Sequence, residues 1–174
     1  MSLEMTAVWW LRHEKKCVIV LNERSPREWA CGRPDTLGIT KNRYATEIEI
    51  KRTLSDFRAD SGKARTKRRE FYAEKFPKQF YYLVPEPLAE KCLAELPDWA
   101  GLMTSRNGHY LPKILKVSPV NTSSKRYSLR ECCVLSHLMA NQIVSQAVEI
   151  SGLINSFKSG HEPWLPDGVP DYQI

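Results

Sequence analysis

Three polar residues, Asp35, Glu49 and Lys51, have the types and the spacing of a divalent-metal site. Side chains alternate across a β-strand, so Glu49 and Lys51 on one strand would project from the same face, roughly 7 Å apart. If the preceding strand pairs antiparallel with it, the carboxylate of Asp35 comes beside that of Glu49. Two convergent carboxylates suit a hard cation such as Mg²⁺ or Mn²⁺. A neighbouring lysine could orient or help deprotonate an attacking water and stabilise charge developing on a phosphate.

The plain alternative is a surface strand whose outward face carries Glu47, Glu49 and Lys51 as solvated charges with cross-strand partners. Three features of the context favour the metal site. A proline precedes the aspartate, isoleucines that would point into a core flank the glutamate, and a basic segment follows the lysine. Glu47 could bind a second ion, although a charge at the far end of the strand is the more common role.

The segment between Arg58 and Lys78 carries eight basic residues against three acidic ones. Such a run is most often the solvated face of a helix, but beside a metal site it would place cations where a nucleic-acid backbone binds. Contacts of this kind position DNA without reading its sequence. The residues that we expect to make them are Lys63, Arg65, Lys67, Arg68 and Arg69.

Other polar and aromatic residues have commoner structural uses. Asp56 and Asp60 lie on a helical stretch, where capping or pairing with nearby Arg and Lys is more frequent than catalysis. Tyr72, Tyr81 and Tyr82 could stack on bases, but Tyr81 and Tyr82 lie in the centre of a strand, where tyrosines more often belong to the core. The histidines lack metal-ligand spacing, and the sequence has no Gly-rich phosphate loop or Gly-x-Ser-x-Gly elbow.

The elements that must position these residues alternate between helices and strands. Helical patterns cover 6–16, 55–76, a short stretch after Pro87, and a long stretch that begins with a capping box at Ser128 and Glu131. Extended patterns cover 17–21, 28–31, 33–40, 44–51 and 79–84, and a hairpin around Asn107-Gly108 joins 101–106 to 109–117. This order predicts an α/β fold with a mixed central β-sheet flanked by helices, as a single domain over 1–157 followed by an irregular Pro/Gly-rich tail over 158–174.

The composition is that of an ordinary globular domain, with 174 residues, 42% of them hydrophobic and 26% charged. No apolar run approaches the ~20 residues of a membrane span, and the first ten residues lack the features of a secretory signal. The five cysteines contain no C-x-x-C and are expected to be reduced thiols. We therefore expect a cytoplasmic protein with no membrane partner, monomeric or homodimeric, whose net charge of +6 is compatible with DNA as a partner.

The sequence Arg33-Pro34-Asp35, followed by Glu49-Ile50-Lys51, resembles the PD-(D/E)XK nuclease superfamily. More narrowly, the chain resembles the MmcB-like branch, which is associated with DNA repair, over roughly residues 14–117. The blocks that carry this resemblance, in order, are 28–35, 49–51, 55–60, 80–85 and 96–102. The basic segment after residue 60 is longer than that branch leads us to expect, and the C-terminal helix and tail fall outside the match.

The resemblance implies a restriction-endonuclease-like core and a Mg²⁺ or Mn²⁺ site. Its metal ligands would be Asp35, Glu49 and the backbone carbonyl of Ile50, with Lys51 as the water-activating lysine. The implied activity is metal-dependent hydrolysis of DNA phosphodiester bonds, in DNA repair or in mobile-element DNA processing. Two alternatives remain: a catalytically silent DNA-binding module with the same fold, and an accessory protein whose carboxylates merely pair with basic residues.

Many members of the superfamily add a glutamate from an early helix. In this chain the helical candidates are Glu4 and Glu14, whereas Glu28 lies in an extended segment. The sequence leaves the choice among them open.

Overall fold

The computed structural model describes residues 2–22, 34–61, 73–105 and 110–158. Its helices are α1 (Leu3–His13), α2 (Leu54–Ser61), the 3₁₀ turn η1 (Glu86–Leu88), α4 (Ala89–Ala94) and α5 (Leu129–Lys158). Its strands are β1 (Cys17–Asn22), β2 (Thr36–Thr40), β3 (Ala45–Ile50), β4 (Gln79–Pro85), β5 (Gly101–Ser105) and β6 (Lys113–Lys116). The expected extended piece 28–31, the Asn107-Gly108 turn and most of the tail lie outside the described residues.

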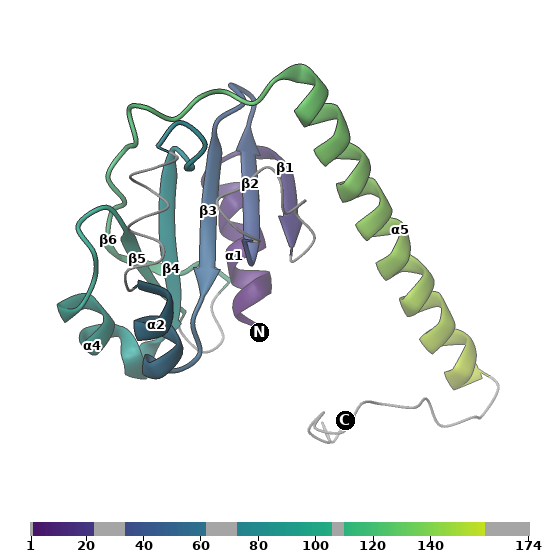
Figure 1. The fold of residues 1–174 in the computed structure, drawn as a ribbon. Helices are drawn as coiled ribbons and strands as arrows, with labels where there is room; N and C mark the ends of the chain where they lie inside the picture. Colours follow the sequence, from purple (N-terminus) through teal and green to yellow (C-terminus); the bar gives the residue numbers. More distant parts are fainter. Residues whose placement is uncertain (1, 23–33, 62–72, 106–109, 159–174) are drawn as a thin grey trace. The chain divides into compact units, whose positions relative to one another are not determined.

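The strands form one six-stranded sheet in the order β1-β2-β3-β4-β5-β6 (Figure 1). β1, β2 and β3 run antiparallel to one another, β3, β4 and β5 run parallel, and β6 is antiparallel to β5. The two parallel pairings need crossovers, which pass through α2 and through η1 and α4. The predicted fold class, α/β with a mixed central sheet flanked by helices, is therefore confirmed.

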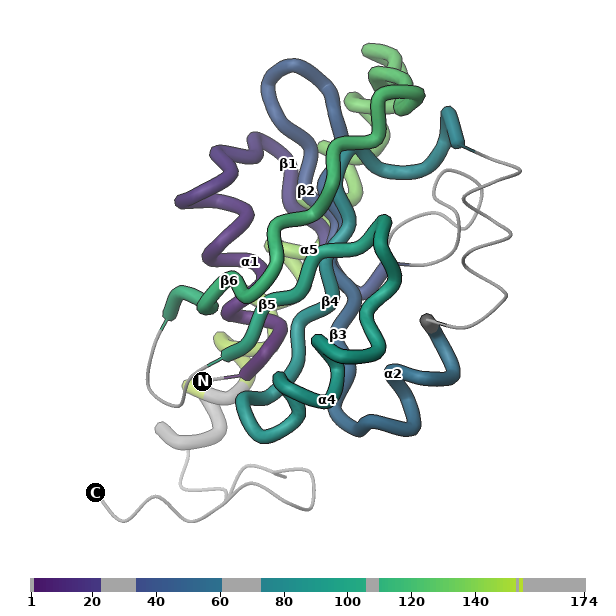
Figure 2. Tube along the Cα trace, turned by 90° about the vertical axis from the view of Figure 1, so that its left-hand side faces the viewer, coloured from purple at the N-terminus to yellow at the C-terminus, as the bar shows by residue number. Residues whose placement is uncertain are grey.

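One face of the sheet is covered by α1, while α2 lies on the other side (Figure 2). Trp10 and Leu11 of α1 pack with Ile48 and Ile50 of β3 in one buried cluster. The helix begins three residues earlier than its sequence pattern predicts, because Ser2 is the N-cap and accepts a hydrogen bond from the amide of Met5.

The opposite face carries two separate apolar clusters. Aromatic side chains of β4 pack with Phe57 of α2 and with Trp99 in the first of them. In the second, Leu135 of α5 packs on residues of β1 and β2. The predicted capping box is present at the start of α5, where the Ser128 hydroxyl accepts from the Glu131 amide and the Glu131 carboxylate accepts from the Ser128 amide.

By packing, the chain divides into two compact units, Met1–Met139 and Ala140–Ile174. The first contains the whole sheet and the start of α5, and the second contains the rest of that helix. The single domain expected over 1–157 stays a prediction. No helix among the described residues is long and apolar enough to cross a membrane.

Candidate functional site

Asp35 lies immediately before β2, at the edge of the β2–β3 ladder. The ladder pairs Thr36 with Ile48, and extending that register by one residue places Asp35 opposite Glu49. The Asp35 carboxylate accepts a hydrogen bond from the Ile50 amide at 2.7 Å. The sequence pattern places this aspartate within the strand. In the structure it lies just outside the strand, and its side chain hydrogen-bonds to β3 beyond the last backbone pair of the ladder.

Glu49 and Lys51 project from the same face of β3 and the chain segment that follows it, as their spacing predicts. The Lys51 ammonium lies 3.3 Å from a Glu49 carboxylate oxygen. Both residues are buried, with 3% of Glu49 and 7% of Lys51 exposed. The solvated surface strand, which was the plain alternative, is therefore wrong for these two residues. Ile48 and Ile50 point the other way, into the cluster under α1.

Helix α2 brings two further carboxylates to Lys51. Asp60 lies 3.5 Å and Asp56 3.8 Å from the ammonium nitrogen. Residues four apart share one face of a helix, so a single helix orientation delivers both. The prediction that these aspartates pair with a nearby basic residue is confirmed, and their partner is the lysine of the candidate site itself.

The charge around Lys51 determines its protonation state. Burial by itself would lower the pKa of the ammonium, but the negative charges of Glu49, Asp60 and Asp56 outweigh burial and raise the pKa above its ordinary value. Lys51 is therefore a protonated ammonium at neutral pH. Its chemistry in this arrangement is that of a fixed cation and hydrogen-bond donor.

Tyr82 joins the site through Asp60. Its hydroxyl donates to the Asp60 carboxylate at 3.1 Å, and its ring is fully buried against Phe57 of α2. Tyr82 is the parallel-register partner of Glu49 across β3 and β4. Sequence reasoning placed Tyr82 in the core and missed its second role, because the register of two parallel strands cannot be read from their residues.

Glu47 differs from its expected role as a charge at the far end of the strand. Only 2% of this residue is exposed. Its neighbours in the ladders, Leu37 and Phe80, are also buried. Residues 47, 49 and 51 thus form a row of buried charged side chains on this face of the sheet.

The donor set expected for a divalent cation fits the chemistry of this position in part. Asp35 and Glu49 are brought to neighbouring positions, and Ile50, whose carbonyl is the third expected ligand, contacts Asp35 through its amide. Across the described part of the chain, no three His, Cys, Asp or Glu side chains come together as a metal site. Two carboxylates and a carbonyl suit Mg²⁺, which retains several waters in most protein sites.

The candidates for an additional glutamate separate clearly. Glu4 forms an ion pair with Arg52, which follows Lys51 directly in the chain, so it lies near the site's end of the sheet. Glu14 is the exposed residue that follows the last turn of α1, near the start of β1. Glu28 lies outside the described residues, as do the five expected DNA contacts, Lys63, Arg65, Lys67, Arg68 and Arg69.

Comparison with known proteins adds information on the fold alone. No protein-family model and no curated protein matches the sequence. Among solved structures, the chain is similar to SPO1766, a protein of unknown function from Silicibacter pomeroyi, with a TM-score of 0.50 and 19% sequence identity. The similarity covers 92% of this chain and 94% of that one.

Proposed function

We propose that this protein is a metal-dependent phosphodiesterase that acts on DNA. The observation that carries the proposal is the convergence of Asp35, Glu49 and Lys51 where β3 ends. The buried Glu49 carboxylate beside the buried Lys51 ammonium costs free energy to desolvate, so a purely structural sheet gains little from this pair. A phosphate-cleaving site, by contrast, requires these groups to be held out of bulk water.

In this proposal Asp35, Glu49 and the Ile50 carbonyl hold Mg²⁺ or Mn²⁺. The bound cation supplies Lewis acidity at the phosphoryl group. Lys51 donates hydrogen bonds and stabilises negative charge on the phosphate. Because its pKa is raised, it orients the attacking water rather than removing a proton from it.

Asp60 and Tyr82 position the lysine. Tyr82 fixes Asp60 by a hydrogen bond, and Asp60 lies within ion-pair distance of the ammonium. A charged group held by such contacts needs less reorganisation when charge develops on a substrate. α2 is therefore part of the proposed site.

The cellular setting follows from the same proposal. The described cysteines, Cys17, Cys92, Cys132 and Cys133, are free thiols, which fits a reducing cytoplasm. A net charge of +6 favours a polyanionic partner. We propose roles in DNA repair or in mobile-element DNA processing, for a monomer or a homodimer.

A catalytically silent DNA-binding module is the second candidate. The observation that favours it is that three carboxylates already engage Lys51, so the cluster is satisfied by its own charges. Such a protein would keep its DNA affinity without turning over any substrate.

Metal binding separates the two candidates. Calorimetric titration with Mn²⁺ should give one binding event in the wild type, and Asp35→Asn and Glu49→Gln should each weaken it at least tenfold. Asp98→Asn removes an exposed carboxylate before β5 and should leave the titration unchanged. No Mn²⁺ binding by the folded wild type, with DNA affinity intact in all variants, would replace the enzyme with the binding module.

A further inference from the structure

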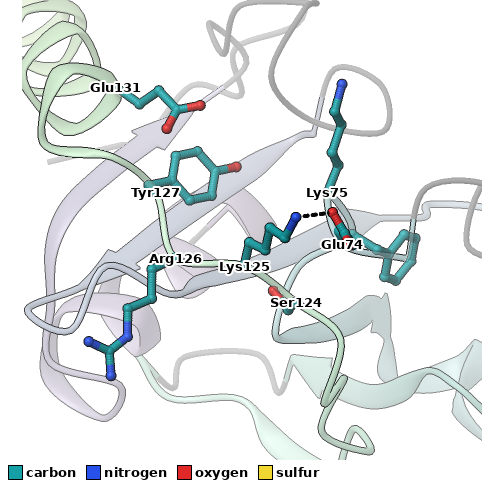
Figure 3. Close-up of a pocket in the computed structure, with 8 residues that line it drawn as sticks. Glu74, Lys75, Ser124, Lys125, Arg126, Tyr127 and Glu131 are labelled. Atoms are coloured by element: carbon teal, nitrogen blue, oxygen red, sulfur yellow. Dashed lines mark ion pairs between the residues drawn. The ribbon is translucent and has the colours of Figure 1, made fainter.

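A basic cavity lies at the far end of β3 from Lys51. Its volume is about 460 Å³, and its walls are the loop before β4 and the segment before α5. The residues that line it are Glu74, Lys75, Phe76, Ser124, Lys125, Arg126, Tyr127 and Glu131 (Figure 3). All of them belong to the unit that contains the sheet.

Backbone hydrogen bonds hold the two walls in place. The Lys125 amide donates to the Glu74 carbonyl at 2.9 Å, and the Asn121 amide donates to the Lys78 carbonyl at 2.9 Å. The Asn121 side chain also donates to the carbonyls of Ala73 and Phe76. The cavity is thus preformed, and a ligand would pay little ordering cost to use it.

The carboxylates of the cavity are already engaged within the protein. Glu131 accepts from both the amide and the hydroxyl of Ser128 in the capping box. Glu74 forms an ion pair with Lys125. Over the described part of the chain, neither Lys75 nor Arg126 has a carboxylate within ion-pair distance.

A third cation extends this surface past the cavity. The ammonium of Lys78 lies 4.7 Å from the ring centroid of Tyr44, and the Arg126 guanidinium lies 5.3 Å from the same centroid. Arg126 also donates a hydrogen bond to the Tyr44 hydroxyl. Among the described residues, neither Lys78 nor Arg126 has a carboxylate within ion-pair distance, so the two cations at this ring make an electropositive spot.

We propose that Lys75, Lys78 and Arg126 bind the phosphodiester backbone of a nucleic acid at a second site. Lys75 and Arg126 point in opposite directions from the two walls (Figure 3), which suits an extended chain of phosphates better than one small anion. The inference rests on the proposed function, since it assigns the cluster at Lys51 and this cavity to one substrate.

The position of the second site predicts a length requirement. Tyr44 precedes β3 and Lys51 follows it, so the two sites are separated by about 20 Å at the rise of a strand. That distance corresponds to roughly six base pairs of duplex, at about 3.4 Å per pair. A substrate must extend at least this far from the position of Lys51 to reach both.

Salt-dependent binding without divalent metal tests this proposal. Fluorescence anisotropy in EDTA should show that Lys75→Gln combined with Arg126→Gln lowers DNA affinity at least tenfold at 100 mM salt. The slope of log K against log salt should fall by about 2, since each lost phosphate contact removes about 0.9. The single variant Arg126→Lys, in which Lys75 is unchanged, keeps the charge and should show most of the wild-type salt slope.

Controls and substrate length make the result specific. Lys113 lines a different pocket, together with Glu86 and Glu90. Lys113→Gln should therefore leave the DNA affinity and the salt slope unchanged. The wild type should gain affinity steeply as duplexes lengthen from about 6 to 16 base pairs, and the double variant should gain much less.

The outcomes separate this inference from the proposed function. Wild-type affinity and slope in the double variant would overturn the second site and leave the cluster at Lys51 untouched. A double variant that loses affinity for tripolyphosphate but keeps wild-type affinity for DNA would also overturn the second site, in favour of a small-anion site. A double variant that loses affinity while the wild type cuts no DNA supports the second site and removes the catalytic claim. If the folded wild type binds no DNA, both proposals are wrong.

Discussion

Lys51 lies buried among three acidic side chains, Glu49, Asp56 and Asp60. An ammonium removed from water in this way depends on its partners, and they depend on it. Because the pKa of Lys51 is raised above its ordinary 10.5, its stabilising contribution is complete below that pH and is lost only as the pH rises further. Lys51 therefore stays protonated across the physiological range.

Removing the ammonium alone should be costly. Lys51→Met should lower the free energy of unfolding by about 3 kcal/mol, because it leaves the buried Glu49 carboxylate without its cation. Adding Glu49→Gln should recover much of that loss, while any metal-dependent activity stays absent. Urea unfolding of the four members of this cycle measures the coupling, and strictly additive effects would contradict it.

The thiol of Cys17 should make stability fall in alkaline solution. Burial raises its pKa from 9.0 to about 11. Between these values the folded protein retains a proton that the unfolded chain loses, so stability declines as the pH rises. From pH 7.5 to pH 10 this thiol should account for a loss of about 1–1.5 kcal/mol.

Cys17→Ala should remove that part of the pH dependence in guanidinium unfolding at the two pH values. Cys133→Ala, which changes an exposed thiol, should leave it in place. Parallel pH profiles for the wild type and Cys17→Ala would mean that folding does not raise the pKa of this thiol.

At the scale of elements, two glycines allow close packing on the sheet. A Cβ at Gly38 would lie 2.8 Å from the Cys17 sulfur and 2.8 Å from a Leu11 methyl carbon of α1. A Cβ at Gly101 would lie 2.6 Å from the Ser118 backbone nitrogen and 2.5 Å from the Tyr81 ring. The first clash involves side chains that can move, whereas the second involves backbone.

Gly38→Ala should therefore cost about 1–3 kcal/mol of unfolding free energy, and Gly101→Ala should cost more. Thermal or urea unfolding of the two variants gives the order directly. A smaller loss at Gly101 would show that the segment around Ser118 can shift away from β5.

The first turns of α5 should contribute to the stability of the sheet unit. Leu135 is fully buried against β1 and β2, whereas its neighbour Val134 is 39% exposed. Leu135→Ala should cost about 2–5 kcal/mol and Val134→Ala well under 1 kcal/mol, because only the first opens a cavity. Equal losses in chemical unfolding would contradict the docking of this segment.

At the scale of the whole molecule, the sequence contains much of the fold but only part of the candidate site. Period-2 alternation placed Glu49 and Lys51 on one face and Ile48 and Ile50 on the other, because strand geometry is local. The antiparallel pairing of β2 with β3 could also be predicted from the sequence, since only a short turn separates the two strands.

The remaining parts of the site depend on non-local packing. Asp60 meets Lys51 and Tyr82 because α2 docks on β4, and the β3–β4 register is parallel. The basic cavity likewise joins residues about fifty positions apart in the chain. No periodicity in the sequence predicts the contacts of Asp60 or the formation of the cavity.

A cleavage assay on defined DNA measures the proposed phosphodiesterase activity. Supercoiled plasmid, linear duplex, single-stranded and branched DNA are incubated with Mg²⁺, Mn²⁺ or EDTA, using the wild type, Asp35→Asn, Lys51→Met and the control Asp98→Asn. We expect cleavage that EDTA abolishes. Asp35→Asn and Lys51→Met should each reduce it at least a hundredfold, and Asp98→Asn should retain it. Folded wild-type protein that cuts none of these substrates, or Asp35 and Lys51 variants that cut as fast as the wild type, would contradict the proposed activity.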